Sequence, residues 1–206
     1  MSQAAQDVGQ VAVPAAPQPA KSLRADARRN RDALLKSATR AFSAHGTDAS
    51  LEDIAKKAGV GIGTLYRHFP ARHDLIEAVY WQEVEALCLG ADELLATHPP
   101  DEALVEWMRR FVDYVGVKKG LVGALKEVLA LDSPVFTVTR EQLYGAVGRL
   151  IDAAVAAGTI RDDTTPDDLL RGLSGFCMVS DDPGWRERAE RLVTLLVDGL
   201  RYGAKA

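Results

Sequence analysis

The sequence predicts an all-α protein, with a small N-terminal three-helix domain followed by a larger helical domain. Apolar residues recur at steps of three and four along almost the whole chain, and no stretch keeps the period-two alternation of a strand. Glycine and proline interrupt this pattern where helices are expected to end. Because 47% of the 206 residues are apolar, the chain has enough hydrophobic mass for a core.

The first helix is predicted over residues 26–45. Leu34 and Phe42 fall on one face of it, and Gly46 follows as a C-terminal stop. The segment before it, residues 1–21, is rich in Ala, Gln and Pro and predicts a disordered tail. This tail has neither a basic start nor an uninterrupted apolar run, so it does not read as a signal peptide.

Two short helices are predicted next. Ser50 is the expected N-cap of the second helix, and Asp53, three residues later, completes a capping box. Gly59 ends this helix, and a third helix is expected over residues 62–68. The three helices define a predicted domain over residues 22–73.

The remainder, residues 74–206, is predicted to form one larger domain of further helices. A Pro-rich segment and a clear Asp-Asp-Pro-Gly turn at residues 181–184 separate some of them. The expected helices are 74 to about 97, 101–118, 120–131, 134–157, 166–180 and 185–202.

Charge is distributed unevenly along the chain. Residues 21–75 hold eleven Lys/Arg against six Asp/Glu, whereas residues 76–206 hold fourteen against twenty-two. This asymmetry indicates that the N-terminal part meets a polyanion. The two cysteines, Cys88 and Cys177, match no metal-binding spacing and favour a reducing compartment, so a cytoplasmic protein is expected. No apolar run approaches the ~18 residues of a membrane span.

The stretch GVGIGTLYRHFP, residues 59–70, places three glycines within five positions. Its Gly59-x-Gly61-x-Gly63 spacing follows a helix and does not fit the dinucleotide-binding fingerprint, and it lacks the Gly-Lys-Ser/Thr end of a P-loop. A helix-turn-helix explains it better. Gly59 can adopt the left-handed conformation that ends a helix, and Gly61 is an acceptable N-cap that lets a phosphate approach the backbone.

The predicted helix 62–68 has one inward and one outward face. Leu65 and Phe69, four residues apart, would hold it against its neighbours. Small residues near its start allow close approach to a DNA major groove. The outward face carries Ile62, Gly63, Thr64, Arg67 and His68.

The segment SLEDIAKKAGVGIGTLYRHFPARHDLIEAV, residues 50–79, resembles the DNA-binding signature of the TetR (tetracycline-repressor) family. The resemblance covers roughly residues 25–80, and the remaining two-thirds is similar only in being all-helical and of suitable length. Two positions depart from the usual pattern: Gly61, where members often carry Ser, and Arg72-His73, where Lys is common. The matching pieces are Ile54-Ala55, Ala58-Gly59-Val60, Gly63-Thr64-Leu65-Tyr66, His68-Phe69 and Asp74-Leu75.

The resemblance implies a transcriptional regulator, with repression as the expected action. It would bind a palindromic operator in double-stranded DNA as a homodimer, and a small-molecule effector would release it. Helix 62–68 would enter the major groove, with Arg67 as the best candidate for reading a guanine. The implied DNA-contacting set is Arg28, Ser50, Gly61, Ile62, Gly63, Thr64, Tyr66, Arg67, His68 and Arg72.

The resemblance also implies a ligand pocket and a dimer interface in the larger domain. For any single apolar residue there, a plain core role is the favoured interpretation over a place in the pocket wall. The expected pocket residues are Trp81, Trp107, Met108, Phe111, Tyr114, Phe136, Tyr144 and Phe176, with Arg109, Glu127, Arg140 and Ser174 as polar partners. The expected dimer residues, on the last two helices, are Leu169, Leu173, Leu192, Leu195, Leu196 and Leu200.

An enzyme is not expected, and neither is a cofactor. The sequence shows no His-x-x-Glu-His type spacing and no Gly-x-Ser-x-Gly elbow. The acidic pairs Asp162-Asp163 and Asp167-Asp168 predict a capping cluster near Thr165, with a metal site as the less favoured reading. The alternative function is a helical small-molecule-binding protein or enzyme whose DNA-binding motif is vestigial.

Overall fold

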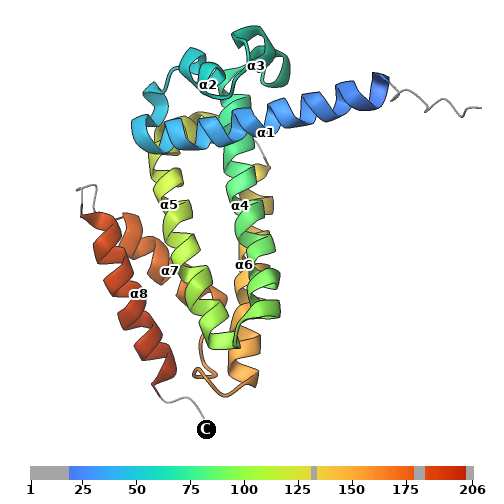
Figure 1. The fold of residues 1–206 in the computed structure, drawn as a ribbon. Helices are drawn as coiled ribbons and strands as arrows, with labels where there is room; N and C mark the ends of the chain where they lie inside the picture. The colour runs from blue at the N-terminus through green and yellow to red at the C-terminus, as the bar shows by residue number, and fades with distance from the viewer. Residues whose placement is uncertain (1–18, 131–133, 179–183, 203–206) are drawn as a thin grey trace, which may run out of the picture.

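The computed structural model describes residues 19–130, 134–178 and 184–202, in which all regular structure is helical (Figure 1). The predicted all-α fold class is confirmed. The helices are α1 Pro19–His45, the 3-10 helix η1 Gly46–Asp48, α2 Leu51–Lys57, α3 Ile62–His68, α4 Arg72–Thr97, α5 Pro100–Ala130, α6 Val135–Ala156, α7 Pro166–Met178 and α8 Trp185–Arg201.

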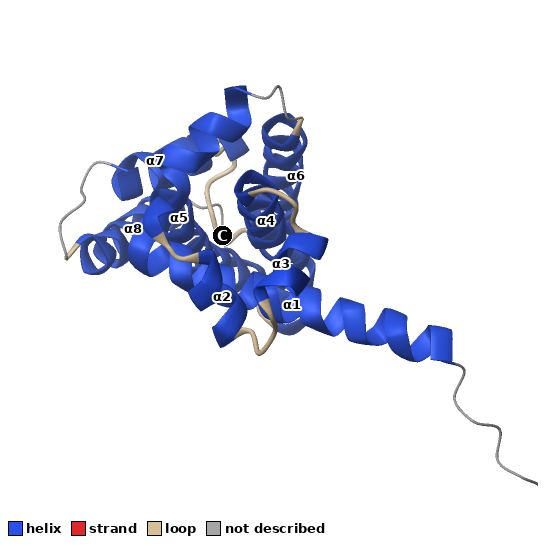
Figure 2. Cartoon of the chain, turned by 90° about the horizontal axis from the view of Figure 1, so that it is seen from above, coloured by secondary structure: helices blue, strands red, loops and turns tan. Residues whose placement is uncertain are grey.

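The helices form a small cap on one end of a longer bundle. α1 lies across this end, α2 and α3 sit on its outer side, and α4, α5 and α6 run away from it (Figure 1). α4 packs along both α5 and α6, and α7 packs against α5, α6 and α8. Seen from above, the N-terminal half of α1 projects away from the rest of the molecule (Figure 2).

The N-terminal helix is longer than the sequence predicts. α1 begins at Pro19, well before residue 26, and takes in the end of the segment expected as a tail. Proline is favourable at the first helical position because its missing N–H would have no partner there. The next residues are mainly Ala, Lys, Leu and Arg, which are good helix formers. The remainder of the expected tail, residues 1–18, lies outside the described residues.

The prediction of two separate helices over residues 101–118 and 120–131 was wrong. α5 continues through Gly120 without a break. A side chain at Gly120 would collide with the backbone carbonyl oxygen of Phe42 on α1. Glycine therefore permits a close crossing of α1 and α5 here and does not end a helix. Gly46, by contrast, does end α1 in the left-handed conformation, with φ +58°.

One hydrophobic core runs through both predicted domains. Phe42 of α1, Leu75 of α4 and Trp107 of α5 all belong to it and are fully buried. α4 begins at Arg72, so the predicted boundary between residues 73 and 74 falls within its first turn. α4 thereby connects the cap rigidly to the bundle. Among the described helices, none has the length and apolar character needed to cross a bilayer.

Candidate functional site

The turn between α2 and α3 has the geometry that its glycine predicts. Gly59 has φ +74°, a conformation that costs little only for glycine. The Gly59 N–H donates to the Lys56 carbonyl at 3.1 Å, and the Val60 N–H donates to the Ala55 carbonyl at 3.0 Å. These two bonds form a Schellman motif, which ends α2 and fixes the direction of the chain that enters α3.

α3 is held by its inner face and is open on its outer face. Leu65 and Phe69 are almost completely buried in the core, as the sequence predicts. On the opposite side, the exposed fractions are 36% for Ile62 and 46% for Tyr66, and Arg67 is also exposed. A helix of two turns is not stable alone. The packing of Leu65 and Phe69 in the core therefore holds α3 in place, with its outer face toward solvent.

The start of α3 is sterically open. Gly61 is the N-cap residue, and a side chain added at Gly61 or at Gly63 would meet no atom within 4 Å. Thr64 and His68 are half-buried, and the His68 ring lies 6.3 Å from that of Phe69. The unobstructed backbone N–H groups at this end suit an anion such as a DNA phosphate.

Ser50 and Arg72 make contacts within the protein at the edge of this surface. The Ser50 hydroxyl accepts a hydrogen bond from the Asp53 N–H at 3.2 Å, which is the capping bond that the sequence predicts. The Arg72 guanidinium donates to the Ala49 carbonyl at 2.6 Å and lies over the Phe42 ring at 5.8 Å. Both residues therefore stabilise the cap of the molecule, and their expected DNA contacts stay predictions.

Buried contacts fix α2 and α3 to α1. The Ser37 hydroxyl on α1 donates to the carbonyl of Ile54 on α2 at 2.9 Å, away from solvent. The Arg31 guanidinium lies 5.5 Å from the centre of the Phe69 ring at the end of α3. Arg28, one turn earlier on α1, is exposed. The surface formed by α3 is thus rigid and is flanked by basic residues of α1.

A cavity of about 440 Å³ lies between α4, α5, α6 and α7, and we call it the central cavity. Its volume is in the range of small-molecule sites. Four of the expected pocket residues line it, together with two of their expected polar partners. These six residues are Phe111, Tyr114, Phe136, Tyr144, Arg140 and Ser174.

The central cavity also has lining residues that the sequence pattern did not predict. Lys118 follows Tyr114 by one helical turn, and Arg171 precedes Ser174 by three residues. Each therefore shares a helix face with an expected pocket residue, and this spacing could have predicted its place in the lining. Tyr80 lies far away in the sequence and had no such signal. The remaining lining residues are the apolar Val115, Leu143 and Leu170.

The floor of the central cavity holds two buried tyrosines. The Tyr114 hydroxyl donates to the Tyr80 hydroxyl at 3.2 Å, and the Tyr80 ring packs 5.2 Å from that of Phe136. Burial raises the pKa of Tyr114 far above its ordinary value, and the neighbouring Tyr80 raises it further. The Tyr114 phenol is therefore neutral at physiological pH, and the two rings offer an aromatic, weakly polar surface.

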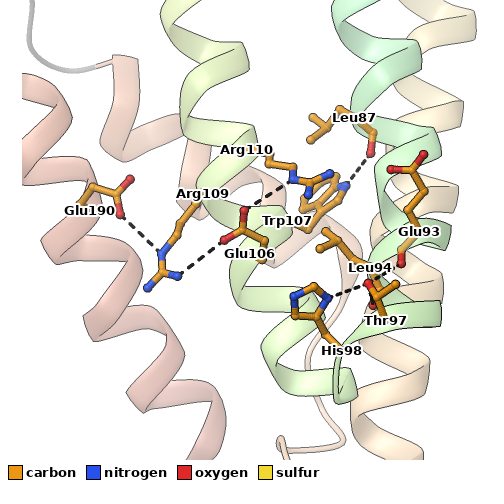
Figure 3. A network of polar contacts seen from close by, with 10 residues as sticks. All are labelled: Leu87, Glu93, Leu94, Thr97, His98, Glu106, Trp107, Arg109, Arg110 and Glu190. Carbon is orange, nitrogen blue, oxygen red and sulfur yellow. Dashed lines mark hydrogen bonds and ion pairs between the residues drawn. The ribbon is translucent and has the colours of Figure 1, made fainter.

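Trp107, Met108 and Trp81 do not line the central cavity, contrary to expectation. Trp107 and Met108 are fully buried in the core, and the Trp107 indole Nε1–H donates to the Leu87 carbonyl at 2.9 Å (Figure 3). Trp81 lies on the side of α4 that faces α1, where it borders a separate hollow. Phe176 lies outside the described side chains.

The expected polar partner Arg109 also lies elsewhere. Its guanidinium is 3.7 Å from Glu106 and 3.8 Å from Glu190 on α8, so it bridges α5 and α8 (Figure 3). The side chain of Glu127 is not among those described. On α7, Asp168 accepts hydrogen bonds from Thr165 at 2.5 and 3.3 Å, which is the predicted capping arrangement. The described residues hold no cluster suited to a metal ion.

The leucines expected at a dimer interface divide into two groups. Leu169, Leu173 and Leu200 are buried inside the protomer, so they are not available to a partner. On α8, Leu200 shares the inward stripe with the smaller residues Ala189, Val193 and Val197. Leu192 and Leu196 are half-buried, and Leu195 is 65% exposed.

Family comparisons account for both parts of the chain. A model described as bacterial regulatory proteins of the tetR family matches residues 34–79. A model of the C-terminal domain of SbtR-like transcriptional regulators matches residues 99–202. The chain belongs to the TetR family. It is accordingly a TetR-family transcriptional regulator, from a family of DNA-binding proteins and not of enzymes.

Two solved TetR-family structures resemble the chain over most of its length. A TetR transcriptional regulator from Streptomyces coelicolor is 48% identical with a TM-score of 0.77, and the match covers 83% of this chain and 98% of that one. A TetR regulatory protein from Mycobacterium vanbaalenii is 36% identical with a TM-score of 0.71, covering 87% and 99%.

A curated relative matches over a shorter region. An HTH-type transcriptional regulator of Staphylococcus aureus (strain USA300) is 38% identical over 64 residues, which are 31% of this chain and 35% of that protein. The match thus spans about a third of that relative. The TetR-like regulator LfrR from Mycobacterium smegmatis, solved in complex with proflavine, shares the fold with a TM-score of 0.60 at 20% identity.

Proposed function

We propose that the chain is a cytoplasmic repressor that binds a palindromic operator as a homodimer and leaves it when a small molecule fills the central cavity. The observation that carries this proposal is the outer face of α3. It combines an open, glycine-containing start with exposed Tyr66 and Arg67, and the core fixes its position. Such a face fits a major groove, where a guanidinium can bond guanine O6 and N7 together.

The DNA contacts would divide into two kinds. Arg67, Thr64 and the residues at the start of α3 would meet base edges and so determine sequence preference. Tyr66, His68 and Arg28 would meet phosphates, which fix orientation and make binding dependent on salt. In a two-fold dimer the two copies of α3 would lie about 34–36 Å apart and would require a roughly palindromic site.

Release by a ligand would act through the crossing of α1 and α5. Phe111, Tyr114 and Lys118 of α5 line the central cavity, and Gly120 of the same helix touches α1 at Phe42. A ligand that prefers a shifted α5 would therefore also shift α1 and the attached α2 and α3. The ligand would bind the shifted conformation more tightly than the DNA-binding one. The loss of DNA-binding free energy would be limited by this difference in ligand affinity.

The test of this function is the selection of random duplex DNA by the purified full chain at near-physiological salt. An enriched pseudo-palindrome is the expected result, and the enriched sequence then serves as a probe for ligands. Absence of enrichment from folded, dimeric protein would reject the regulator function. It would leave a helical small-molecule-binding protein with a vestigial motif as the better description.

A further inference from the structure

The central cavity is apolar and aromatic at its floor and cationic at its rim. The floor residues Tyr80, Phe111 and Tyr114 are buried. The rim residues are only half-buried or exposed, and three of them are basic: Lys118, Arg140 and Arg171. The lining contains no carboxylate among the described side chains. This is notable in a domain whose Asp/Glu outnumber its Lys/Arg.

One of the three cations is already neutralised. The Arg171 Nε–H donates to Asp167 at 2.5 Å, and the Tyr144 hydroxyl donates to the other oxygen of the same carboxylate at 2.6 Å. The hydrogen bond from Tyr144, and then that from Arg171, lowers the pKa of Asp167. Asp167 is thus ionised and hydrogen-bonded by Tyr144 and Arg171, and the positive charge of Arg140 also lowers its pKa.

The other two cations are positioned at the cavity wall. The Lys118 ammonium lies 5.9 Å from the centre of the Tyr114 ring, and the Arg140 guanidinium lies 5.2 Å from that of Tyr144. Both rings line the central cavity. Arg140 also donates to the Tyr144 hydroxyl at a long 3.4 Å. Neither Lys118 nor Arg140 forms an ion pair with a carboxylate among the residues that the structure describes.

We propose that the effector of this regulator is an organic anion: a carboxylate attached to an apolar, preferably aromatic body. The body would pack on Phe111, Phe136 and Tyr114, and the carboxylate would lie between Lys118 and Arg140. A cationic ligand would meet the like charges of Lys118 and Arg140, neither of which is in a direct ion pair. A strongly polar anion such as a nucleotide would leave its polar groups unpaired on an aromatic floor. This inference rests on the proposed function only in treating the central cavity as the effector site.

Three compounds with one aromatic body test the charge preference directly. They are 2-naphthoate, 2-naphthylmethanol and 2-naphthylmethylammonium, and each is titrated into the full chain by isothermal calorimetry at low salt. We expect 2-naphthoate to bind roughly tenfold or more tightly than the neutral alcohol, because it adds charge-assisted hydrogen bonds. The ammonium compound should bind most weakly.

Substitutions then locate the anion. Arg140→Gln and Lys118→Gln should each lower the affinity for 2-naphthoate by roughly tenfold and leave that for 2-naphthylmethanol within about twofold. The matched control is Arg149→Gln, because Arg149 lies on the same helix as Arg140 but pairs with Asp92 at 2.8 Å, away from the cavity lining. The control should bind all three compounds as the wild type does.

Three results would overturn the inference. The first is equal or tighter binding of the alcohol or the ammonium compound, the second is unchanged 2-naphthoate affinity in both rim variants, and the third is no binding by any compound. None of these results bears on sequence-specific DNA binding, which the duplex selection tests independently. Conversely, a failed selection combined with tight 2-naphthoate binding would support an anion-binding protein that is not a regulator.

Discussion

At the scale of single residues, Trp107 stabilises the core and does not contribute to the ligand site. It is fully buried, and its indole N–H bonds the Leu87 carbonyl. Trp107→Phe removes this donor and leaves a void, so we expect the free energy of unfolding to fall by about 1–3 kcal/mol. Urea denaturation measures this loss. Binding of 2-naphthoate should stay within about twofold, and a large loss of binding without a loss of stability would contradict this role.

Glu83 gives the fold a defined pH dependence. It lies on α4, accepts a hydrogen bond from Thr39 of α1 at 3.1 Å, and has its pKa raised mainly by burial and further by Asp113. A carboxyl whose pKa is raised on folding favours the fold below its unfolded pKa, and this contribution is lost as the pH rises through the folded pKa. Once ionised, Glu83 therefore destabilises the fold because its charge is partly buried, and the Thr39 hydrogen bond, which favours the ionised carboxylate, offsets only part of this cost.

Glu83→Gln removes this titration and keeps an oxygen for Thr39 to bond. We expect the variant to be more stable than the wild type at pH 8, with the difference shrinking as the pH approaches the ordinary carboxyl pKa of 4.5. Thermal unfolding of both proteins across this range checks the sign. A difference that stays constant with pH, or a variant that is less stable at pH 8, would show that Glu83 does not titrate as described.

At the scale of helices, the crossing of α1 and α5 depends on the absence of a side chain at Gly120. Gly120→Ala would gain roughly 1 kcal/mol of helix propensity but would force apart two helices that are in contact through Phe42. We expect a net loss of about 1–3 kcal/mol in the free energy of unfolding, together with altered DNA affinity.

The matched control for Gly120 is Gly145→Ala. Gly145 is also inside a helix, but it is exposed, and the atom nearest to an added side chain is 3.9 Å away at the flexible end of Arg149. This control should gain up to about 1 kcal/mol. Parallel denaturation curves compare the two variants, and a stabilised Gly120→Ala protein would show that the crossing can relax.

The helices themselves were largely predictable, and the exceptions share one cause. α2, α3 and their turn follow from a cap, a glycine and an apolar pair that act within a few residues. Gly120 was misread because its function is a contact with α1, far away in the sequence. Local patterns do not distinguish a glycine that ends a helix from one that admits a neighbouring helix.

The same limit explains the partial prediction of the ligand site. Trp107 and Phe111 lie one helical turn apart on α5 and carry the same apolar signal, yet only Phe111 lines the central cavity. Which of them meets the cavity depends on how far α6 and α7 stand from α5. Tyr80 lines the cavity from another helix, α4. Its place there also depends on how the helices are spaced, and sequence periodicity carries no information about the spacing between helices.

At the scale of the whole molecule, the proposed function requires two copies, and we propose that α8 offers the surface that joins them. Leu195 is 65% exposed on this helix, whereas its inner residues are already packed. Leu195→Glu should therefore leave the protomer folded and produce a monomer with strongly reduced operator affinity. Light scattering after size-exclusion chromatography measures the mass.

The control for dimerisation is Leu89→Glu on α4, where a leucine is similarly exposed, at 59%, away from α7 and α8. This variant should behave as the wild type in both mass and DNA affinity. A dimeric Leu195→Glu protein that still binds DNA tightly would exclude Leu195 from the interface.

We propose that the outer face of α3 reads DNA sequence. Its most direct test is fluorescence anisotropy with the selected duplex and a shuffled duplex, using the wild type, Arg67→Ala and the control Lys56→Ala on the exposed side of α2. We expect Arg67→Ala to lose about 1–3 kcal/mol of the preference for the selected sequence and Lys56→Ala to keep that preference. An Arg67→Ala protein that retains the full preference would contradict the claim.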